Sequence, residues 1–182
     1  MRIAAIDPSL RRTGLFILDN SRPMWQHSIE SEGHDSDSYL TSNRRVRKLA
    51  AEIRAALAQF DLDYAAIEQH PYAARDGKAH DRGLLWGAIF GDLDVRGVPC
   101  AVINPLYRCA FITGKARADK AVVHAEVNTW WPGVRIANHD VADAAGMAVM
   151  ADMQHGGTAP FEVHEYHRVN VEKVKWPEVV RV

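Results

Sequence analysis

Short apolar runs and longer amphipathic stretches succeed one another along most of this chain. The runs predict strands at residues 2–7, 15–19, 63–68 and 99–104, with a weaker candidate at 23–29. Apolar residues recur every three or four positions over 43–60 and 82–96, as in helices, and further helices are predicted at about 105–114, 116–130 and 140–153. The first strands follow one another directly, whereas the later ones alternate with helices. The pattern therefore predicts an α/β fold with a mixed sheet flanked by helices.

The end of the chain, residues 158–182, has a different pattern. Apolar and polar residues alternate there, with Phe161, Val163, Val169 and Val171 on one side. Such alternation is typical of a strand, and it follows the helix at which the core should be complete. We therefore expect a domain over residues 1–157 and a strand-like extension over 158–182 that pairs with a sheet edge or with a second copy.

The composition is that of an ordinary globular domain. Of the 182 residues, 47% are hydrophobic and 25% are charged, and neither a membrane-length apolar run nor a secretory signal is visible. The two cysteines, Cys100 and Cys109, form no C-x-x-C pair, which argues against zinc and fits a reducing cytoplasm. The formal net charge of −1 is unusual for a nucleic-acid-binding domain, which is often basic.

Acidic residues stand at the borders of three predicted elements. Asp7 and Glu68 each end an apolar strand, and Asp140 and Asp143 open an alanine-rich helix. Taken singly, Asp7 before Pro8 would start a turn, Glu68 would be an exposed strand end, and Asp140 would cap its helix. Taken together, clustered carboxylates repel one another unless hard divalent cations such as Mg²⁺ lie between them, and a pair of such ions supports phosphodiester cleavage.

Three segments carry these acidic residues in order, and in combination they are more specific than any one of them. They read AIDPSLRRTG from Ala5, DYAAIEQ from Asp63 and DVADAAGMA from Asp140. The combination resembles the RuvC family of Holliday junction resolvases, which have a ribonuclease H-like fold, over roughly residues 1–153. The resemblance implies a site for two Mg²⁺ ions, with Mn²⁺ as a substitute, whose ligands are Asp7, Glu68, Asp140 and Asp143.

The resemblance also implies a basic residue and a dimer. Lys120, which opens a helix after a turn of small residues, falls on the family position that serves DNA binding and catalysis. Gly83 and Gly87 match a glycine pair on the family's dimer helix. We therefore expect a homodimer built on the helix over 82–96, with apolar side chains that a monomer leaves partly exposed: Trp86, Phe90 and Leu93.

Further residues are candidates for DNA contact. The candidates for holding phosphates, together with Lys120, are Arg11, Arg75, Arg82 and Arg117. The family has an aromatic residue just past the Glu-Gln pair, but this chain has His70-Pro71-Tyr72 there, so Tyr72 is the candidate for contact with unstacked bases. The family's first turn also has Gly where this chain has Ser9.

The predicted function is that of a metal-dependent endodeoxyribonuclease that resolves Holliday junctions by paired nicks. A broader debranching nuclease for forks and flaps, and a non-catalytic DNA-binding module of the same fold, remain as alternatives. The turn ending in Thr13-Gly14 also resembles the phosphate-binding turn of sugar kinases and actin-like ATPases, but the chain leaves no room for their second domain. His139, beside Asp140, is a candidate for helping proton transfer near the metal.

Overall fold

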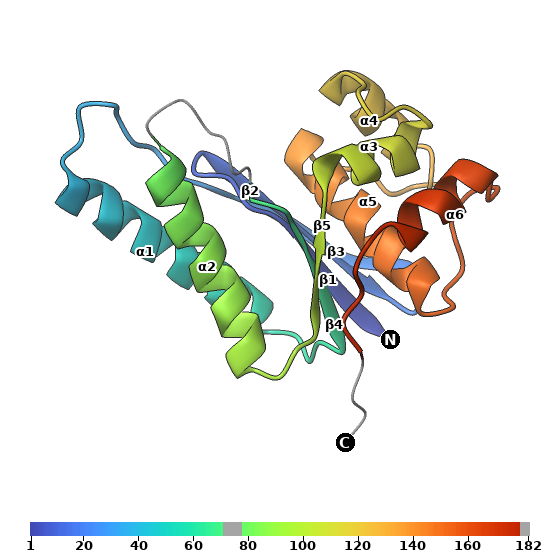
Figure 1. The fold of residues 1–182 in the computed structure, drawn as a ribbon, viewed down its shortest axis with the longest axis horizontal. Coiled ribbons are helices and arrows are strands. Elements are labelled where there is room, and N and C mark those ends of the chain that lie inside the picture. Colours follow the sequence, from blue (N-terminus) through green and yellow to red (C-terminus); the bar gives the residue numbers. More distant parts are fainter. Residues whose placement is uncertain (71–77, 179–182) are drawn as a thin grey trace.

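A five-stranded mixed sheet forms the centre of the structure, with the strand order β3-β2-β1-β4-β5 (Figure 1). The structure, a computed structural model, describes residues 1–70 and 78–178. The strands are β1 (Arg2–Asp7), β2 (Arg12–Asp19), β3 (Arg22–Glu30), β4 (Tyr64–Glu68) and β5 (Cys100–Ile103). The β1–β2 and β2–β3 pairs are antiparallel, whereas β1–β4 and β4–β5 are parallel. The predicted mixed sheet that begins with a meander is therefore confirmed.

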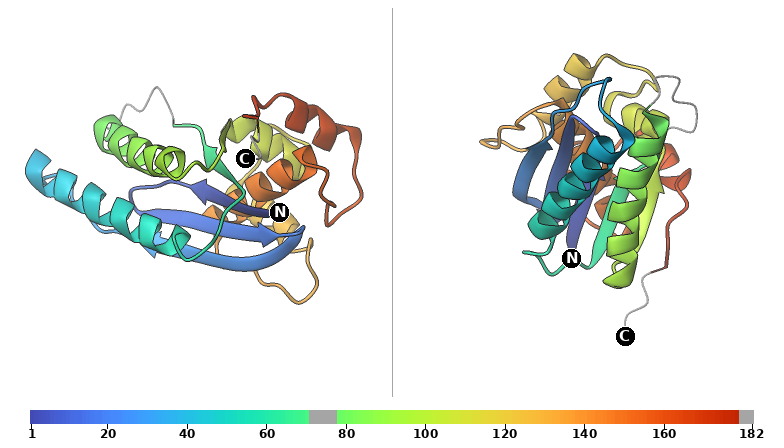
Figure 2. Two further views of the ribbon diagram at one scale, coloured as in Figure 1. Left: turned by 90° about the horizontal axis from the view of Figure 1, so that it is seen from below. Right: turned by 90° about the vertical axis from the view of Figure 1, so that its left-hand side faces the viewer.

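Helices cover both faces of this sheet (Figures 1 and 2). On one face lie α1 (Tyr39–Leu57) and α2 (Ala79–Val95); on the other lie α3 (Pro105–Thr113), α4 (Lys120–Val127), α5 (His139–Gln154) and α6 (Glu165–Glu172). Gly114 ends α3 in the left-handed region (φ 73°). The helix predicted to start at Ala116 starts instead at Lys120, because the backbone is extended at Asp119, its N-cap. Within the described parts of the chain, no helix is both long and apolar enough to cross a membrane.

Small side chains let α5 lie close against the middle of the sheet. All residues of α5 from Asp140 to Asp152 are buried, and many of them are alanines, including Ala142 and Ala145. The facing strands are also rich in alanine, with Ala5 and Ala66 fully buried in the same cluster. This close packing brings the first turn of α5 to the edge of the sheet where β1 and β4 end.

Residues 158–178 contain the helix α6 (Glu165–Glu172) and no strand, so the strand predicted over 158–182 is wrong for the part of it that the structure describes. The buried residues of α6 and the turn after it, His167, Asn170, Val171 and Val174, recur at helical spacing, whereas Val169 is 39% exposed. The N–H of His164 donates to Nδ1 of His167 at 2.9 Å and so caps the helix. Phe111 and His167 pack edge to face at 5.2 Å, and burial lowers the pKa of His167 to about 4. That residues 1–157 form a domain without this helix stays a prediction.

One face of α2 packs into the core and the other faces outward. Leu85, Ile89 and Leu93 recur every four residues on the inner face, so the expectation that Leu93 is partly exposed is wrong: it is fully buried. Trp86 and Phe90 stack at 4.9 Å and are half-buried. The most exposed large apolar side chains of α2 are Leu84, 39% exposed, and Val95, 88% exposed.

Candidate active site

The ends of two neighbouring strands place Asp7 beside Glu68. β1 and β4 run parallel, with Ile6 opposite Ile67, so the next residue of each strand reaches the same edge of the sheet. Asp7 is buried at 8% exposure, and Glu68 is half-buried. A carboxylate at the end of a buried strand is rigidly held, because the strand is fixed by ladders on both sides.

The first turn of α5 adds Asp140 and Asp143 to this edge. Asn138 caps α5: its Oδ1 accepts hydrogen bonds from the backbone N–H groups of Asp140 and Val141, each at 3.1 Å. The carboxylate of Asp140 is therefore not used in capping and faces the strand ends. Asp143 follows three residues later on the same side of the helix and is 4% exposed. The structure thus brings together all four predicted acidic residues, although their metal-binding role stays a prediction.

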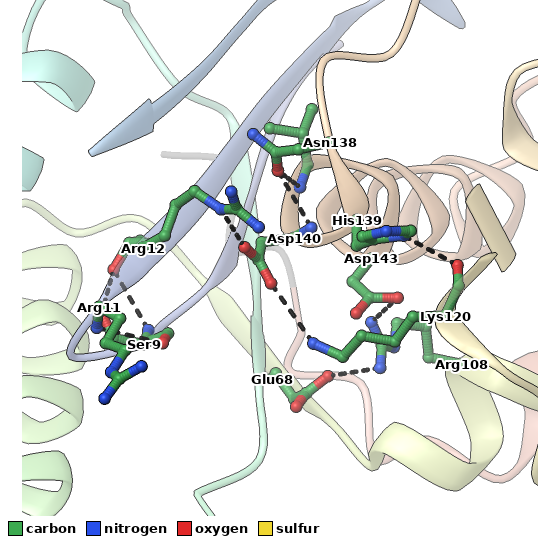
Figure 3. A network of polar contacts seen from close by, with 12 residues as sticks. Ser9, Arg11, Arg12, Glu68, Arg108, Lys120, Asn138, His139, Asp140 and Asp143 are labelled. Carbon is green, nitrogen blue, oxygen red and sulfur yellow. Dashed lines mark hydrogen bonds and ion pairs between the residues drawn. The ribbon is translucent and has the colours of Figure 1, made fainter. Parts of the chain in front are cut away.

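Three cations from other segments pair with three of these carboxylates, those of Glu68, Asp140 and Asp143 (Figure 3). Arg12 Nε lies 2.6 Å from Asp140 Oδ2, and Lys120 Nζ lies 3.5 Å from Asp140 Oδ1. Arg108, on α3, pairs through Nη2 with Glu68 Oε2 at 3.0 Å and through Nη1 with Asp143 Oδ1. Lys120, whose side chain is 69% exposed, therefore lies at the carboxylates, and its role in DNA binding and catalysis stays a prediction.

Arg108 is the site residue that the sequence analysis missed. It lies in an otherwise apolar stretch between Tyr107 and Cys109 and is 8% exposed. A charged side chain is rarely buried unless it is paired, so a lone arginine within an apolar helix was a usable signal. The sequence did not indicate which acidic residues it would meet, because α3 and its partners are far apart along the chain.

Burial and mutual repulsion act on the carboxylates. The pKa of Asp7 is raised to about 8, first by burial and then by the charge of Glu68, while Arg108 opposes the shift. Burial also raises the pKa of Glu68, against the opposing charges of Arg108 and Lys120. A protein without metal therefore keeps Asp7 largely protonated near neutral pH, and binding of a cation would release that proton.

The donor set has the chemistry that Mg²⁺ requires, since it consists of carboxylate oxygens. Within residues 1–70 and 78–178, the carboxylate of Asp7 has no hydrogen bond or ion pair, and Oε2 of Glu68 is buried without a hydrogen bond. No group of three or more acidic, histidine or cysteine side chains in the described residues is arranged as a ready metal-binding cluster. The residues therefore suit a divalent cation by their chemistry, and Glu68 and Asp143 are held by Arg108 instead.

The turn between β1 and β2 is closed by its own hydrogen bonds. Thr13 Oγ1 donates to the carbonyl of Ser9 at 3.0 Å and accepts from the N–H of Ser9 at 3.2 Å. Thr13 is fully buried, so its hydroxyl serves the turn. Gly14 packs on α5, where an added Cβ would lie 2.2 Å from the backbone carbonyl carbon of Asp140. This turn thus sets the distance between β2 and the first turn of α5.

The structure describes only some of the residues that were predicted to contact DNA. Arg11 is exposed on the first turn, and Arg117 is exposed between α3 and α4. Arg82 lines a cavity of about 390 Å³ that Arg11, Arg45 and Lys78 also line. Tyr72 and Arg75 lie outside the described residues. His139 contacts the carbonyl of Lys120 through Nδ1 at 3.0 Å, so it helps hold the start of α4.

A mixed sheet between helical layers, with carboxylates where its central strands end, defines an α/β protein of ribonuclease H-like fold with an acidic centre. Residues 3–151 match the family model described as crossover junction endodeoxyribonuclease RuvC, and the chain belongs to this family. The sequence-based recognition of the family and fold is therefore confirmed. The match stops before α6.

Individual relatives agree with this assignment. The chain is 30% identical over 156 residues to a crossover junction endodeoxyribonuclease RuvC of Cereibacter sphaeroides, covering 82% of this chain and 88% of the relative. It is 29% identical over 158 residues to that of Paramagnetospirillum magneticum, covering 87% and 94%. The fold is similar to Thermus thermophilus RuvC in complex with a Holliday junction substrate, with a TM-score of 0.69 and 22% identity over 87% of this chain and 98% of that one.

Proposed function

We propose that this chain is a Mg²⁺-dependent endodeoxyribonuclease that resolves four-way DNA junctions by paired nicks. The observation that carries the proposal is the meeting of Asp7, Glu68, Asp140 and Asp143 at one edge of the sheet, with Lys120 beside them. Membership of the RuvC family supports the same activity, because its curated relatives are named as crossover junction endodeoxyribonucleases. The expected location is the cytoplasm, where the free Cys100 and Cys109 stay reduced.

Each group at the site has a role in this proposal. The four carboxylates hold Mg²⁺, with Mn²⁺ as a substitute. When bound, the metal lowers the pKa of the attacking water and stabilises the leaving 3′ oxygen. The side chain of Lys120 is exposed enough to hold the phosphate beside Asp140, and Arg11 and Arg117 contact phosphates further along the DNA.

A panel of labelled DNA substrates tests the proposal. With Mg²⁺, the protein should nick a four-way junction at symmetric positions on two strands, and chelation of the metal should stop the reaction. Three-way, flap and linear duplex DNA of the same sequence serve as controls. Equal cleavage of flaps and forks would favour the broader debranching nuclease, whereas binding without cleavage under all metal conditions would favour the non-catalytic module.

The proposed substrate is two-fold symmetric, and paired nicks need two sites, so we propose a homodimer. The outward face of α2 suits this contact, because Leu84 is 39% exposed and a Cβ on Gly87 or Gly91 would meet no atom within 4 Å. Sedimentation should therefore give twice the chain mass of 20.3 kDa.

Leu84→Glu should raise the dimer dissociation constant at least about tenfold, because burying an unpaired carboxylate costs more than about 1.4 kcal/mol. Leu40→Glu is the matched control, since Leu40 is an exposed leucine (58%) on α1. Analytical ultracentrifugation measures both variants. An unchanged dissociation constant for Leu84→Glu would remove α2 from the interface, and a wild-type monomer that still makes paired cuts would contradict the dimer.

A further inference from the structure

Arg108 occupies an unusual place in the proposed metal site. Its guanidinium pairs with two of the four carboxylates, Glu68 and Asp143. These two belong to different elements, β4 and α5, so Arg108 connects the sheet edge to the helix (Figure 3). Arg12 and Lys120, by contrast, both pair with Asp140 alone at this site.

The surroundings of Arg108 hold its side chain in the site. Its side chain is 10% exposed, and its Cγ lies 3.6 Å from where a Cβ on Gly146 of α5 would stand. The stem is thus confined between α3 and α5, and the charge cannot move far toward solvent. A divalent cation that binds Glu68 or Asp143 must therefore do so close to a fixed positive charge.

The contacts of Arg108 are ion pairs with incomplete hydrogen bonding. Its Nη1 and Nε, and Oε2 of Glu68, are buried without a hydrogen bond, although the opposite charges lie in contact. A guanidinium that fitted these carboxylates ideally would donate two aligned bonds to them. The arrangement therefore neutralises the charge of the carboxylates without completing their hydrogen bonds. Carboxylate oxygen atoms thus remain available to a divalent cation.

We propose that Arg108 is an internal counter-cation: it holds Glu68 and Asp143 together in the metal-free protein and competes with the metal for them, so that it sets the metal affinity. This inference rests on the proposed metal-dependent function. Its role is that of a positioning residue, acting on the two carboxylates rather than on the DNA. The aliphatic stem of Arg108 contributes to packing, and its charge determines the concentration of divalent cation at which the site is occupied.

Calorimetric titration with Mn²⁺ and Mg²⁺ tests the inference on the purified full chain. Arg108→Met keeps most of the aliphatic stem and removes the charge. The variant should therefore bind metal at least about tenfold more tightly than the wild type. The reason is that repulsion between a unit charge and an ion a few ångströms away corresponds to more than a tenfold change in affinity at the effective dielectric of such sites. The same variant should melt at a lower temperature without metal and gain more from added metal than the wild type.

Two comparisons make the result decisive. Arg2→Met removes a partly buried ion pair with Asp19 at the opposite end of β1 and should leave metal affinity unchanged. Arg108→Lys keeps the charge but not the planar fork, so it should bind metal less tightly than Arg108→Met. If Arg108→Met does not fold without metal, recovery of its native near-ultraviolet circular dichroism on addition of Mn²⁺ supports the inference, and failure to recover overturns it.

An affinity of folded Arg108→Met equal to or weaker than that of the wild type would overturn the competition. The proposed function fails separately: a wild-type protein that binds neither Mn²⁺ nor Mg²⁺ at millimolar concentration would contradict the metal site itself.

Discussion

Asp7→Asn should reduce junction cleavage by about 10³-fold or more while leaving junction binding intact or tighter. The expected loss follows because the metal supplies several kcal/mol of transition-state stabilisation, and each 1.36 kcal/mol is a factor of about ten in rate. Asn keeps the shape of Asp7 at the end of β1 and removes a group that repels the phosphate whenever it is ionised, as it is above about pH 8 or with metal bound. Single-turnover cleavage and a gel-shift measurement separate the two effects. Full cleavage by both Asp7→Asn and Glu68→Gln would show that these carboxylates do not form the active site.

The same substitution should change how stability depends on pH. The pKa of Asp7 is raised from 3.8 to about 8 in the folded protein, so the folded state holds a proton there that the unfolded state has released. Without metal, the free energy of unfolding should therefore fall as pH rises from about 4 to about 8. Asp7→Asn removes this dependence and should be more stable than the wild type at pH 8. Thermal melts in a chelator, at several pH values, measure the difference, and parallel pH profiles would contradict the raised pKa.

Gly14→Ala should lower both stability and cleavage. An added Cβ would stand 2.2 Å from the carbonyl carbon and oxygen of Asp140 and 2.7 Å from the N–H nitrogen of Val141, and backbone atoms of a buried helix cannot move aside without moving α5. Overpacking of this kind costs up to about 3 kcal/mol, which corresponds to a melting temperature lower by about 6–12 °C for a chain of this size. Displacement of Asp140 should reduce cleavage about 10²-fold, the loss expected for a misplacement of about 1 Å.

Gly91→Ala is the matched control for this substitution. No atom lies within 4 Å of its added Cβ, and alanine favours a helix such as α2 by about 1 kcal/mol over glycine. This variant should therefore melt at or above the wild-type temperature. Because Gly91 lies on the proposed dimer face, it is the control for stability, and the wild type is the reference for cleavage. If Gly14→Ala melts like the control and cuts like the wild type, the turn does not position α5 as described.

Local sequence determined much of the sheet and the positions of the carboxylates. The runs ending in Asp7 and Glu68 are apolar on both faces, so each had to be a buried strand with its acidic residue at the rim. The amphipathic periods of α1 and α2 were also readable, since one face of each helix meets the core. The family's three acidic segments then predicted which strand ends and which helix come together, before any contact was known.

Other features depended on tertiary packing. The alternation around Val169 looked like a strand, but burial of His167, Asn170 and Val171 against neighbouring helices selected the helix α6, because local preferences of so short a segment are weak. The burial of Leu93 likewise followed from which side of α2 met the sheet.

The partners of Arg108 show the division most clearly. In the sequence, Arg108 is visible only as a charge within an apolar helix. Its pairing with Glu68 and Asp143 joins α3, β4 and α5, which are separated along the chain. An ion pair depends on distance and burial, and only the folded chain sets these. Local sequence therefore specified which carboxylates this protein presents, and the packing of α3 against β4 and α5 specified that Arg108 pairs with Glu68 and Asp143.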